Sequence, residues 1–497
     1  MFTLACLVTG DGAEFIVQWA RAFGGPQKDS SIRAAVGPDG YVTVATRVPT
    51  HLGPVPQVVR SKNWESKNRL HLIRYNSVGR EQWNIRCEGD GTVHASGIAA
   101  GRQHVYVSIW YTGSVKLRGR TLPPAKPKRN DLTVGSVLAC ISVDGNLLWV
   151  KDEVGGLVAV DANEHCLLLQ NGSADVFALP HRFSGCSQLT KFAPSGKPQW
   201  SVELVRGTGF VKARGLSVDE DDNAAAFNWV SGEVVATGRI VSSPASHGLV
   251  GTWISAAGKT TGTRFWQAPA QLNREGMSIT DAVSDRQGGV FFTGYERQYD
   301  SESETDTAAD SVDGRRVVTM HGFVGHWDAT GGLRWLHLAE GAVSRFRGLA
   351  LGGQNQLLVT GMAGGAGIAL GGAYLRTYAE REASIETQES YLAELSFDGT
   401  VKGMKRYRAT GKASGYDIVA NDRGYVYLVG GFGPNFDVDN EGSFLPRRRR
   451  HSSMTTEAGR LYGARPVLPN DFVGNSGLPI RHTSANASAY LLSLHRK

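Results

Sequence analysis

The sequence predicts an all-β protein, a single seven-bladed β-propeller with four-stranded antiparallel blades. Three observations lead to this prediction: a tryptophan-ended phrase recurs along the chain, a second phrase alternates with it, and the two chain ends supply parts of one blade. Repeats of this length share one core, so the 497 residues do not require several separate domains.

The first phrase is an apolar strand, a short polar turn, and a strand that carries tryptophan. Asp-Gly and Ser-Gly occupy several of these turns, and glycine accepts the positive φ that a tight hairpin turn requires. A large aromatic side chain at this position would fill the wedge between two blades near the outer edge of the disc. The residues at this position are Trp83, Trp149, Trp200, Trp266, Trp335 and, in a sixth copy, Met404.

The second phrase is an apolar strand, a polar turn and a strongly β-prone strand, and it occurs seven times. IRAAVGPDGYVTVAT from Ile32 and YDIVANDRGYVYLVGG from Tyr416 are two clear copies. Its alternation with the first phrase gives two hairpins, and therefore four antiparallel strands, in each period of 59 to 68 residues. The second strands are expected to begin near Tyr41, Val105, Cys166, Ala225, Val290, Leu357 and Tyr425.

The two ends of the chain supply complementary parts of the last blade. That blade has a hairpin at 416–430 and a late strand at 489–497, but no tryptophan strand follows. The segment EFIVQWARAFGG, which contains Trp19, stands alone before the first complete hairpin. We expect this N-terminal strand to complete the last blade, which closes the ring and removes two exposed sheet edges. Residues 1–13 are then an N-terminal arm or signal remnant, and 14–497 form the propeller.

These phrases resemble the seven-bladed β-propeller repeat family known as SBBP. NDRGYVYLVGGFGPNFDV (421–438), GSVKLRG (113–119) and CISVDGNLLW (140–149) are similar to its repeat, and the resemblance covers nearly the whole chain. The family implies the propeller fold and, commonly, an exported or cell-surface location. It implies no single activity and no catalytic residues that could be transferred to this chain.

The composition argues against several other classes of protein. No apolar run reaches the roughly 18 residues of a membrane span. The five cysteines are scattered and form no CxxC pair, so we expect free thiols rather than a disulfide framework or a zinc site. The apolar start, MFTLACLVTG, lacks the basic region of a secretion signal, so a secreted or cell-surface location follows from the resemblance alone.

Antiparallel order places all the long insertions on one face of the disc, because they follow the second strands. Long loops on a rigid scaffold are where binding residues concentrate. The insertions of blades 7 (443–488), 1 (60–69) and 2 (116–131) carry net charges of +5, +3 and +5. The blade-5 loop (295–316) carries −4. Since blades 7, 1 and 2 are neighbours in the ring, we predict a basic sector on this face.

The predicted basic sector makes an anionic partner the leading hypothesis. An acidic protein, a polyanionic glycan and a membrane surface are the candidates. Nucleic acid is the least favoured partner, because Trp64 is the only aromatic in the blade-1 and blade-2 loops that could stack a base. The alternative is that the arginine run is simply solvated. The candidate binding residues are Arg447, Arg448, Arg449, Arg450, Lys62, Lys67, Arg69, Lys126, Lys128 and Arg129.

We therefore expect a non-enzymatic binding or scaffold propeller that presents its long loops to a macromolecular partner. The alternative is an enzyme of the glycan hydrolase or lyase type, with its site at the mouth of the central channel. No HExxH or GxSxG motif is present, so no catalytic residue is assigned. Paired carboxylates with perturbed pKa values at the channel mouth, or a metal there, would favour the enzyme, whereas a smooth polar lining would favour the scaffold.

No cofactor and no metal are expected. Asp437, Asp439 and Glu441 resemble the start of a calcium loop, but Arg448 stands where the loop needs a bidentate glutamate. WDATGGLRW (327–335) is similar to the tryptophan-docking repeat of quinone-dependent dehydrogenases, in which this element is structural. Both segments are therefore expected to be ordinary turns.

Replacing Arg447 to Arg450 together by glutamine tests the predicted basic sector. If these arginines attract an anionic partner, capture by anionic glycans, anionic liposomes or DNA should weaken in the variant and fall steeply with salt in the wild type. The measurement is binding to each surface at low and at physiological salt, with neutral glycans as control. Equal capture by variant and wild type would contradict the prediction.

Overall fold

The computed structural model describes a large part of the chain, and that part consists of antiparallel β-strands joined by turns. The predicted all-β class is confirmed, and no helix in the described part is long and apolar enough to cross a membrane. The described residues are 15–23, 33–49, 68–127, 133–171, 185–207, 209–242, 247–270, 272, 276–299, 311–312, 315–340, 343–353, 355–364, 367–376, 388–409, 413–432, 436–438, 480–481 and 488–496.

Seven groups of four antiparallel strands can be traced through the pairing of the described residues. Within each group, every strand pairs with the next. Groups 1 to 4 are β2 (Arg33–Val36), β3 (Val42–Pro49), β4 (Asn68–Tyr75) and β5 (Glu81–Gly89); β6 (Val93–Ala100), β7 (His104–Tyr111), β11 (Thr133–Ser142) and β12 (Leu147–Asp152); β13 (Leu157–Val160), β14 (Cys166–Asn171), β15 (Cys186–Phe192) and β16 (Pro198–Gly207); β17 (Val211–Val218), β18 (Ala224–Ser231), β21 (His247–Ile254) and β22 (Thr260–Gln267).

Groups 5 to 7 follow the same plan. They are β23 (Ser278–Ser284), β24 (Val290–Tyr299), β26 (Arg315–Trp327) and β27 (Leu333–Leu338); β28 (Val343–Leu351), β29 (Leu357–Gly364), β32 (Gln388–Leu395) and β33 (Val401–Ala409); β34 (Ala413–Ala420), β35 (Val426–Phe432), β38 (Ser488–Arg496) and β1 (Phe15–Phe23). All seven second strands begin within one residue of the position that the sequence predicts.

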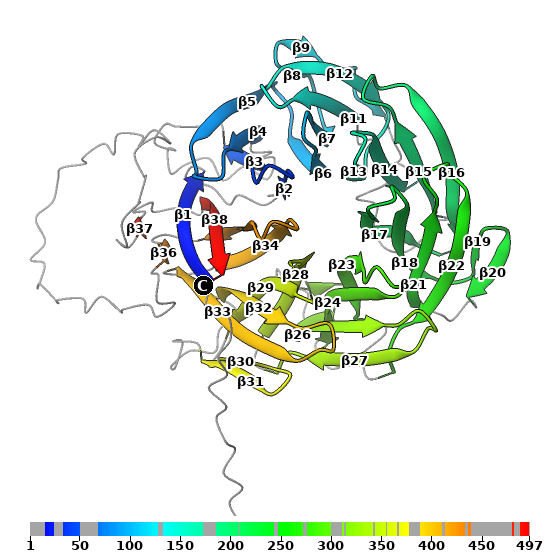
Figure 1. Cartoon of the computed structure of the whole chain (residues 1–497), viewed down its shortest axis with the longest axis vertical. Coiled ribbons are helices and arrows are strands. Elements are labelled where there is room, and N and C mark those ends of the chain that lie inside the picture. The colour runs from blue at the N-terminus through cyan, green and yellow to red at the C-terminus, as the bar shows by residue number, and fades with distance from the viewer. Residues whose placement is uncertain are drawn as a thin grey trace, which may run out of the picture.

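The groups surround a central opening, and the first strand of each group is innermost (Figure 1). Seven hydrophobic clusters of buried residues lie one at each junction between consecutive groups, and one of them joins group 7 to group 1. Apolar burial therefore stabilises the contacts between neighbouring groups rather than one shared centre.

The N-terminal strand pairs with the C-terminal strand, as expected from the sequence. β1 lies antiparallel to β38, with Phe15 opposite Arg496 and Phe23 opposite Ala489. β38 also pairs with β35, so both of its edges are occupied. This pairing joins residues almost the whole chain length apart, which is costly in loop entropy and must be offset by the packing that follows.

The recurring tryptophans contact the next group along the chain. The indole nitrogen of Trp83 donates to the carbonyl of Val143, which lies in the third-to-fourth-strand turn of group 2, at 2.7 Å. A Cβ on Gly145 of that turn would lie 2.8 Å from the Trp83 ring, so only glycine fits there. The same donation joins the indoles of Trp149, Trp200, Trp266 and Trp335 to the carbonyls of Pro194, Ala256, Asp328 and Phe397, respectively.

Several sheets have more than the expected four strands, in part because insertions after second strands pair with the preceding group. β8 (Val115–Leu117) and β9 (Arg120–Thr121) form a hairpin that belongs to group 2 in sequence but pairs with β5 of group 1. β19 (Val234–Ala236) of group 4 pairs in the same way with β16 of group 3, and β36 (Phe436–Val438) of group 7 with β33 of group 6. We call these segments the crossing hairpins.

Replacing Trp83 by Phe should lower the free energy of unfolding by about 2 kcal/mol. The change removes one buried hydrogen bond, worth about 1 kcal/mol, and leaves a small void against Gly145. Denaturant unfolding curves give the difference. Trp253→Phe is the matched control, because the Trp253 indole makes no hydrogen bond in the described part of the chain. Equal losses in the two variants would show that the donated hydrogen bond is not the source.

Candidate functional site

The residues of the predicted basic sector lie largely outside the described residues. Only the backbones of Arg69, in β4, and Lys126, in β10 (Lys126–Pro127), are described. The remaining candidates, with the side chains of those two, lie outside: Arg447, Arg448, Arg449, Arg450, Lys62, Lys67, Lys128 and Arg129. The described part of the chain therefore does not test the basic sector.

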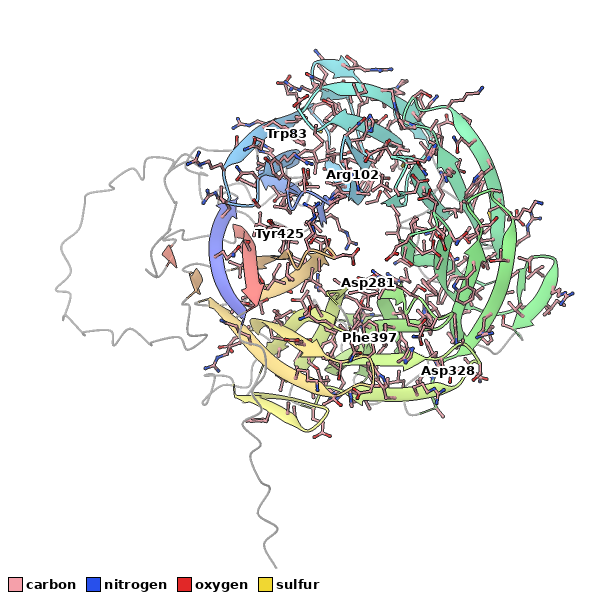
Figure 2. The ribbon with its side chains drawn as sticks, viewed as in Figure 1. Trp83, Arg102, Asp281, Asp328, Phe397 and Tyr425 are labelled. Atoms are coloured by element: carbon pink, nitrogen blue, oxygen red, sulfur yellow. The ribbon has the colours of Figure 1, made fainter. Side chains whose placement is uncertain are left out.

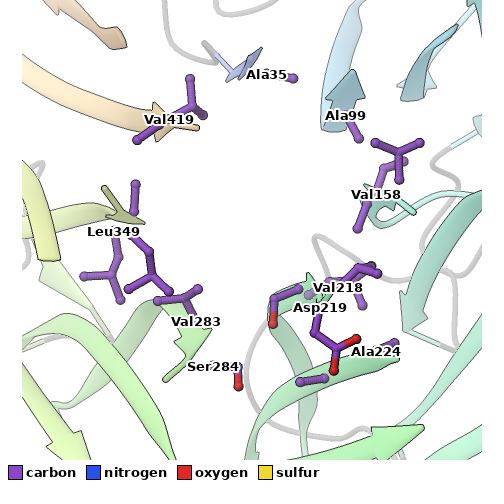
Figure 3. A pocket seen from close by; sticks show the side chains of 18 of the residues that line it. Ala35, Ala99, Val158, Val218, Asp219, Ala224, Val283, Ser284, Leu349 and Val419 are labelled. Atoms are coloured by element: carbon purple, nitrogen blue, oxygen red, sulfur yellow. The ribbon is translucent and has the colours of Figure 1, made fainter. Parts of the chain in front are cut away.

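One cavity of about 480 Å³ lies at the short-turn end of the central opening. Residues from the first strands of all seven groups line it, and most are small or apolar, such as Ala35, Val158 and Leu349 (Figure 3). The polar groups are few, among them Asp219 and Ser284. This lining is neither the smooth polar wall of the scaffold expectation nor a set of paired carboxylates.

The other end of the same strands carries a dense set of charged and aromatic side chains. We call this set the arginine–tyrosine cluster. Asp281, one of its members, is at the inner edge of the ring in Figure 2. The set includes six cations, two carboxylates and two phenols, which electrostatic interaction links to one another. The members are Arg33, Lys212, Arg214, Asp281, Tyr295, Arg297, Arg345, Arg347, Tyr416 and Asp417.

A repeated irregularity of the first strands shapes this end. A register shift occurs at the same point in groups 2, 4, 5, 6 and 7, where the first strand has one more residue than its partner. Arg214, Arg347 and Tyr416 are three of the extra residues. A bulge re-aims the side chains around it and bends the strand. It therefore brings side chains of several groups together at one end, the end at which the long insertions leave the second strands.

Tyr295, near the end of β24, is held by arginines from two strands. Arg345 Nη2 donates to the Tyr295 hydroxyl at 2.8 Å, and Arg297 Nη2 does so at 3.2 Å. The Arg345 guanidinium also lies over the Tyr295 ring, 4.1 Å from its centre. Burial alone would raise the pKa of Tyr295, but Arg345 and Arg297 outweigh it and hold this pKa below its ordinary value. The phenolate form of Tyr295 is thus more stable than that of an ordinary tyrosine.

The cations of the cluster outnumber its carboxylates. Arg347 lies over the Tyr416 ring at 4.5 Å, and Arg214 Nη2 donates to Ser278 Oγ at 3.4 Å. Within the described part of the chain, no carboxylate lies at salt-bridge distance from Arg214, Arg345 or Arg347, and the Nε atom of each is buried without a hydrogen-bond partner. Among the described residues, the positive charge of these guanidinium groups therefore has little compensation.

The pKa values of the cations reflect this crowding. The neighbouring Arg214, followed by burial, lowers the pKa of Lys212 to about 8. Burial lowers the pKa of Arg214 to about 10, with Arg33 and Arg345 adding to the effect. Like charges held together this closely destabilise the folded chain, and such a cost is typical of sites selected for binding or chemistry.

Asp281 and Asp417 occupy equivalent positions in groups 5 and 7, and each fastens the next group. Asp281 Oδ2 accepts a hydrogen bond from the Leu349 amide at 3.0 Å, and Asp417 Oδ2 accepts one from the Ala34 amide at 3.1 Å. Burial and the nearby Asp417 raise the pKa of Asp281 to about 7, and burial raises the pKa of Asp417. Two carboxyl groups with raised pKa values thus lie at this end of the central opening.

Charged groups at the short-turn end are paired. Asp161 accepts from Lys191 at 2.7 Å and from His165 at 3.0 Å, and His326 lies 2.8 Å from Asp285. Each of these carboxylates belongs to a first-to-second-strand turn. No group of metal-ligating side chains occurs among the residues that the structure describes. These pairs are structural, in contrast to the uncompensated arginine–tyrosine cluster.

Of the two motifs weighed for cofactors, the WDATGGLRW segment contains a turn, and the described residue of the other motif lies in a strand. Asp328 Oδ1 of the WDATGGLRW segment accepts the amides of Thr330 and Gly332, and the Trp327 ring stacks on Phe292 at 3.7 Å. Asp437 lies in β36, while Asp439 and Glu441 lie outside the described residues. Four cysteines are free, as expected: Cys87, Cys140, Cys166 and Cys186.

Sequence reasoning missed the arginine–tyrosine cluster, because its members come from five separate groups. The signal that could have found it is local: KAR at 212–214 and RFR at 345–347 place two cations two residues apart at the start of a first strand. Alternating cations at the start of an otherwise apolar inner strand are unusual, since such strands are mostly buried.

No family model and no curated protein matches the chain. Among solved structures, it is similar to an apocarotenoid oxygenase mutant from Synechocystis, with 9% identity over 83% of this chain and 87% of that one, at a TM-score of 0.37. Polysaccharide lyase Uly1 is 11% identical over 78% of this chain and 98% of that one, at a TM-score of 0.32. Likeness at this level carries no argument about activity.

Replacing Asp281 by Asn should change how the free energy of unfolding depends on pH. The pKa of Asp281 is higher in the folded chain than the ordinary value of 3.8, so ionisation costs the wild type stability as pH rises from there to about 7. The free energy of unfolding of Asp281→Asn, relative to the wild type, should therefore improve across that window. Urea unfolding at several pH values measures it, with exposed Asp221→Asn as control. A flat difference would contradict the raised pKa.

Proposed function

We propose that this chain is a seven-bladed β-propeller of the SBBP type, in which each group of four strands is one blade. The support is the sevenfold recurrence of four-stranded groups, the hydrophobic cluster at each junction, and the pairing of β1 with β38. In this arrangement the arginine–tyrosine cluster lies at the end of the central channel from which the long insertions leave.

We further propose that the protein binds an acidic glycan at the arginine–tyrosine cluster. The single observation that carries this proposal is a set of guanidinium groups that have no carboxylate partner in the described part of the chain: Arg214, Arg345 and Arg347. A bound anion would supply the missing countercharge. Guanidinium forks match the two oxygens of a carboxylate, so a chain of carboxylate-bearing sugars is the ligand that this chemistry fits.

Aromatic side chains at the equivalent position in other groups favour a sugar ligand over a simple ion. The pairs His94/Trp110, Lys212/Trp229 and Ser278/Tyr295 occupy one equivalent register position in groups 2, 4 and 5. The rings of His94 and Trp110 are stacked, with centres 4.3 Å apart. Because Trp229 and Tyr295 are buried, the partly exposed His94 and Trp110 are the aromatic surface that a sugar ring would contact.

The sequence predicts a non-enzymatic scaffold that binds an anionic partner. The function proposed here keeps an anionic partner but places its binding site on another surface. The arginine–tyrosine cluster replaces the predicted basic sector as the binding site proposed here. The enzyme alternative gains from the carboxylates with raised pKa values, Asp281 and Asp417.

The double variant Arg345→Gln, Arg347→Gln tests the proposal. Its affinity for a soluble uronate polymer, polygalacturonate, should fall by at least about tenfold, because each lost charge-assisted hydrogen bond is worth about 1.5–3 kcal/mol. Calorimetric titration measures the affinity at low and at physiological salt. The free variant should unfold at a denaturant concentration no lower than the wild type, because like-charge repulsion is relieved.

The matched control replaces two arginines elsewhere, Arg239 in β20 (Arg239–Ser242) and Arg423 in the turn before β35, by glutamine. It removes the same charge and should keep the wild-type affinity. Equal weakening in both double variants would assign binding to net charge. Binding of inorganic phosphate or DNA, with none of uronate polymers, would contradict an acidic glycan as the ligand.

A further inference from the structure

We infer that Tyr295 is a catalytic base that removes the proton from the carbon next to a carboxylate in the bound glycan, so that the protein cleaves uronate chains by β-elimination. This inference rests on the proposed function, since the arginine–tyrosine cluster must first bind the glycan. It adds a reaction class, β-elimination, and a catalytic residue to the proposed binding site.

The geometry around the Tyr295 oxygen is that of an activated base. Two cationic donors, Arg345 and Arg297, point at this oxygen from two different strands. A neutral phenol gains little from two cationic donors, whereas a phenolate gains from both. Tyr295 is 5% exposed, so bulk water has little access to the base.

The charges that interact with Tyr295 come from three strands. They are Arg297 on β24, Arg214 on β17, and Arg345 and Arg347 on β28. These four cations give a positive field at the hydroxyl. This field favours the phenolate and also attracts the carboxylate of the substrate.

The same arginines explain why the substrate must carry a carboxylate. A carbon-bound proton next to a carboxylate is weakly acidic, because its removal places further negative charge on the two carboxylate oxygens. Guanidinium donors fixed beside those oxygens stabilise that charge as it develops. Arg345 donates to the Tyr295 hydroxyl, and Arg347 lies two residues further along β28. The base therefore lies next to guanidinium groups that can stabilise the charge on the substrate carboxylate.

The step balances without an oxidant, a metal or a cofactor. The Tyr295 oxygen takes the proton from the carbon beside the carboxylate, and the C–H electron pair forms a carbon–carbon double bond to the next ring carbon. The bond from that carbon to the glycosidic oxygen breaks, and the leaving oxygen takes a proton from water. One product carries an unsaturated uronate at its non-reducing end, and Tyr295 returns its proton to solvent.

The test follows the full-length chain with polygalacturonate, alginate and hyaluronan as substrates. Elimination produces a double bond conjugated with the carboxylate, which absorbs in the ultraviolet, whereas hydrolysis produces reducing ends without this chromophore. We expect the wild type to produce the chromophore from at least one polymer. Tyr295→Phe should lose at least about 100-fold in rate, the usual contribution of a general base, while its affinity changes less than about threefold.

A second variant separates a catalytic from a structural role. Arg297→Gln removes one donor from the Tyr295 oxygen, so the Tyr295 pKa should rise and the acidic limb of the pH–rate profile should move to higher pH. A side chain that only packs would not move this limb. The control is Tyr374→Phe, on the exposed hairpin strand β31 (Ala373–Arg376), which should keep the wild-type rate and profile.

The outcomes separate the inference from the proposed function. Wild-type protein that binds a polymer but releases no chromophore from any of them overturns the inference and leaves acidic-glycan binding in place. Absence of binding to every polymer overturns both. Reducing ends without chromophore would identify a hydrolase, and an undiminished rate in Tyr295→Phe would assign the base to another residue.

Discussion

The contact on which the rest of the structure depends is the donation from a tryptophan of one group to a turn carbonyl of the next. Each described example joins one group to the next along the chain, as Trp83 does with Val143 and Trp335 with Phe397. The contact fixes both the distance and the rotation between neighbours, because a flat ring must lie against a glycine while its nitrogen reaches a specific oxygen. Small errors in this angle would accumulate around the groups and prevent β1 from reaching β38.

Burial at the regular junctions between groups offsets the like-charge repulsion at the insertion end. At the short-turn end, charges are matched, as in Asp161 with Lys191. At the insertion end, Arg345 repels both Arg214 and Arg347, and none of the three has a carboxylate partner among the residues that the structure describes. A chain with weaker junctions would respond to such repulsion by opening between groups. Rigid neighbours instead keep the guanidinium groups crowded and prearranged for an anion, which reduces the reorganisation that binding requires.

Much of the fold could be predicted from the sequence because its signals are local. Glycine turns such as 142–145 and the tryptophans after them repeat within each period, and the second strands begin within a residue of their predicted positions. The crossing hairpins were not predicted, since GSVKLRG pairs with a strand of another group and its own residues do not specify which. The site was missed for the same reason. Tyr295 and Arg345 are 50 positions apart, and only the packing of one group on the next brings them together.

The antiparallel pairing of β1 with β38 has a consequence for orientation. Phe15 lies opposite Arg496, so the outer ends of both strands emerge together, beside the start of β35, where Val426 pairs with Leu494. That is the end of the short turns, opposite the end where the insertions begin. A tether joined directly to Phe15 or to Arg496 would therefore hold the same face towards its support. It would leave the arginine–tyrosine cluster facing outward, towards whatever diffuses past.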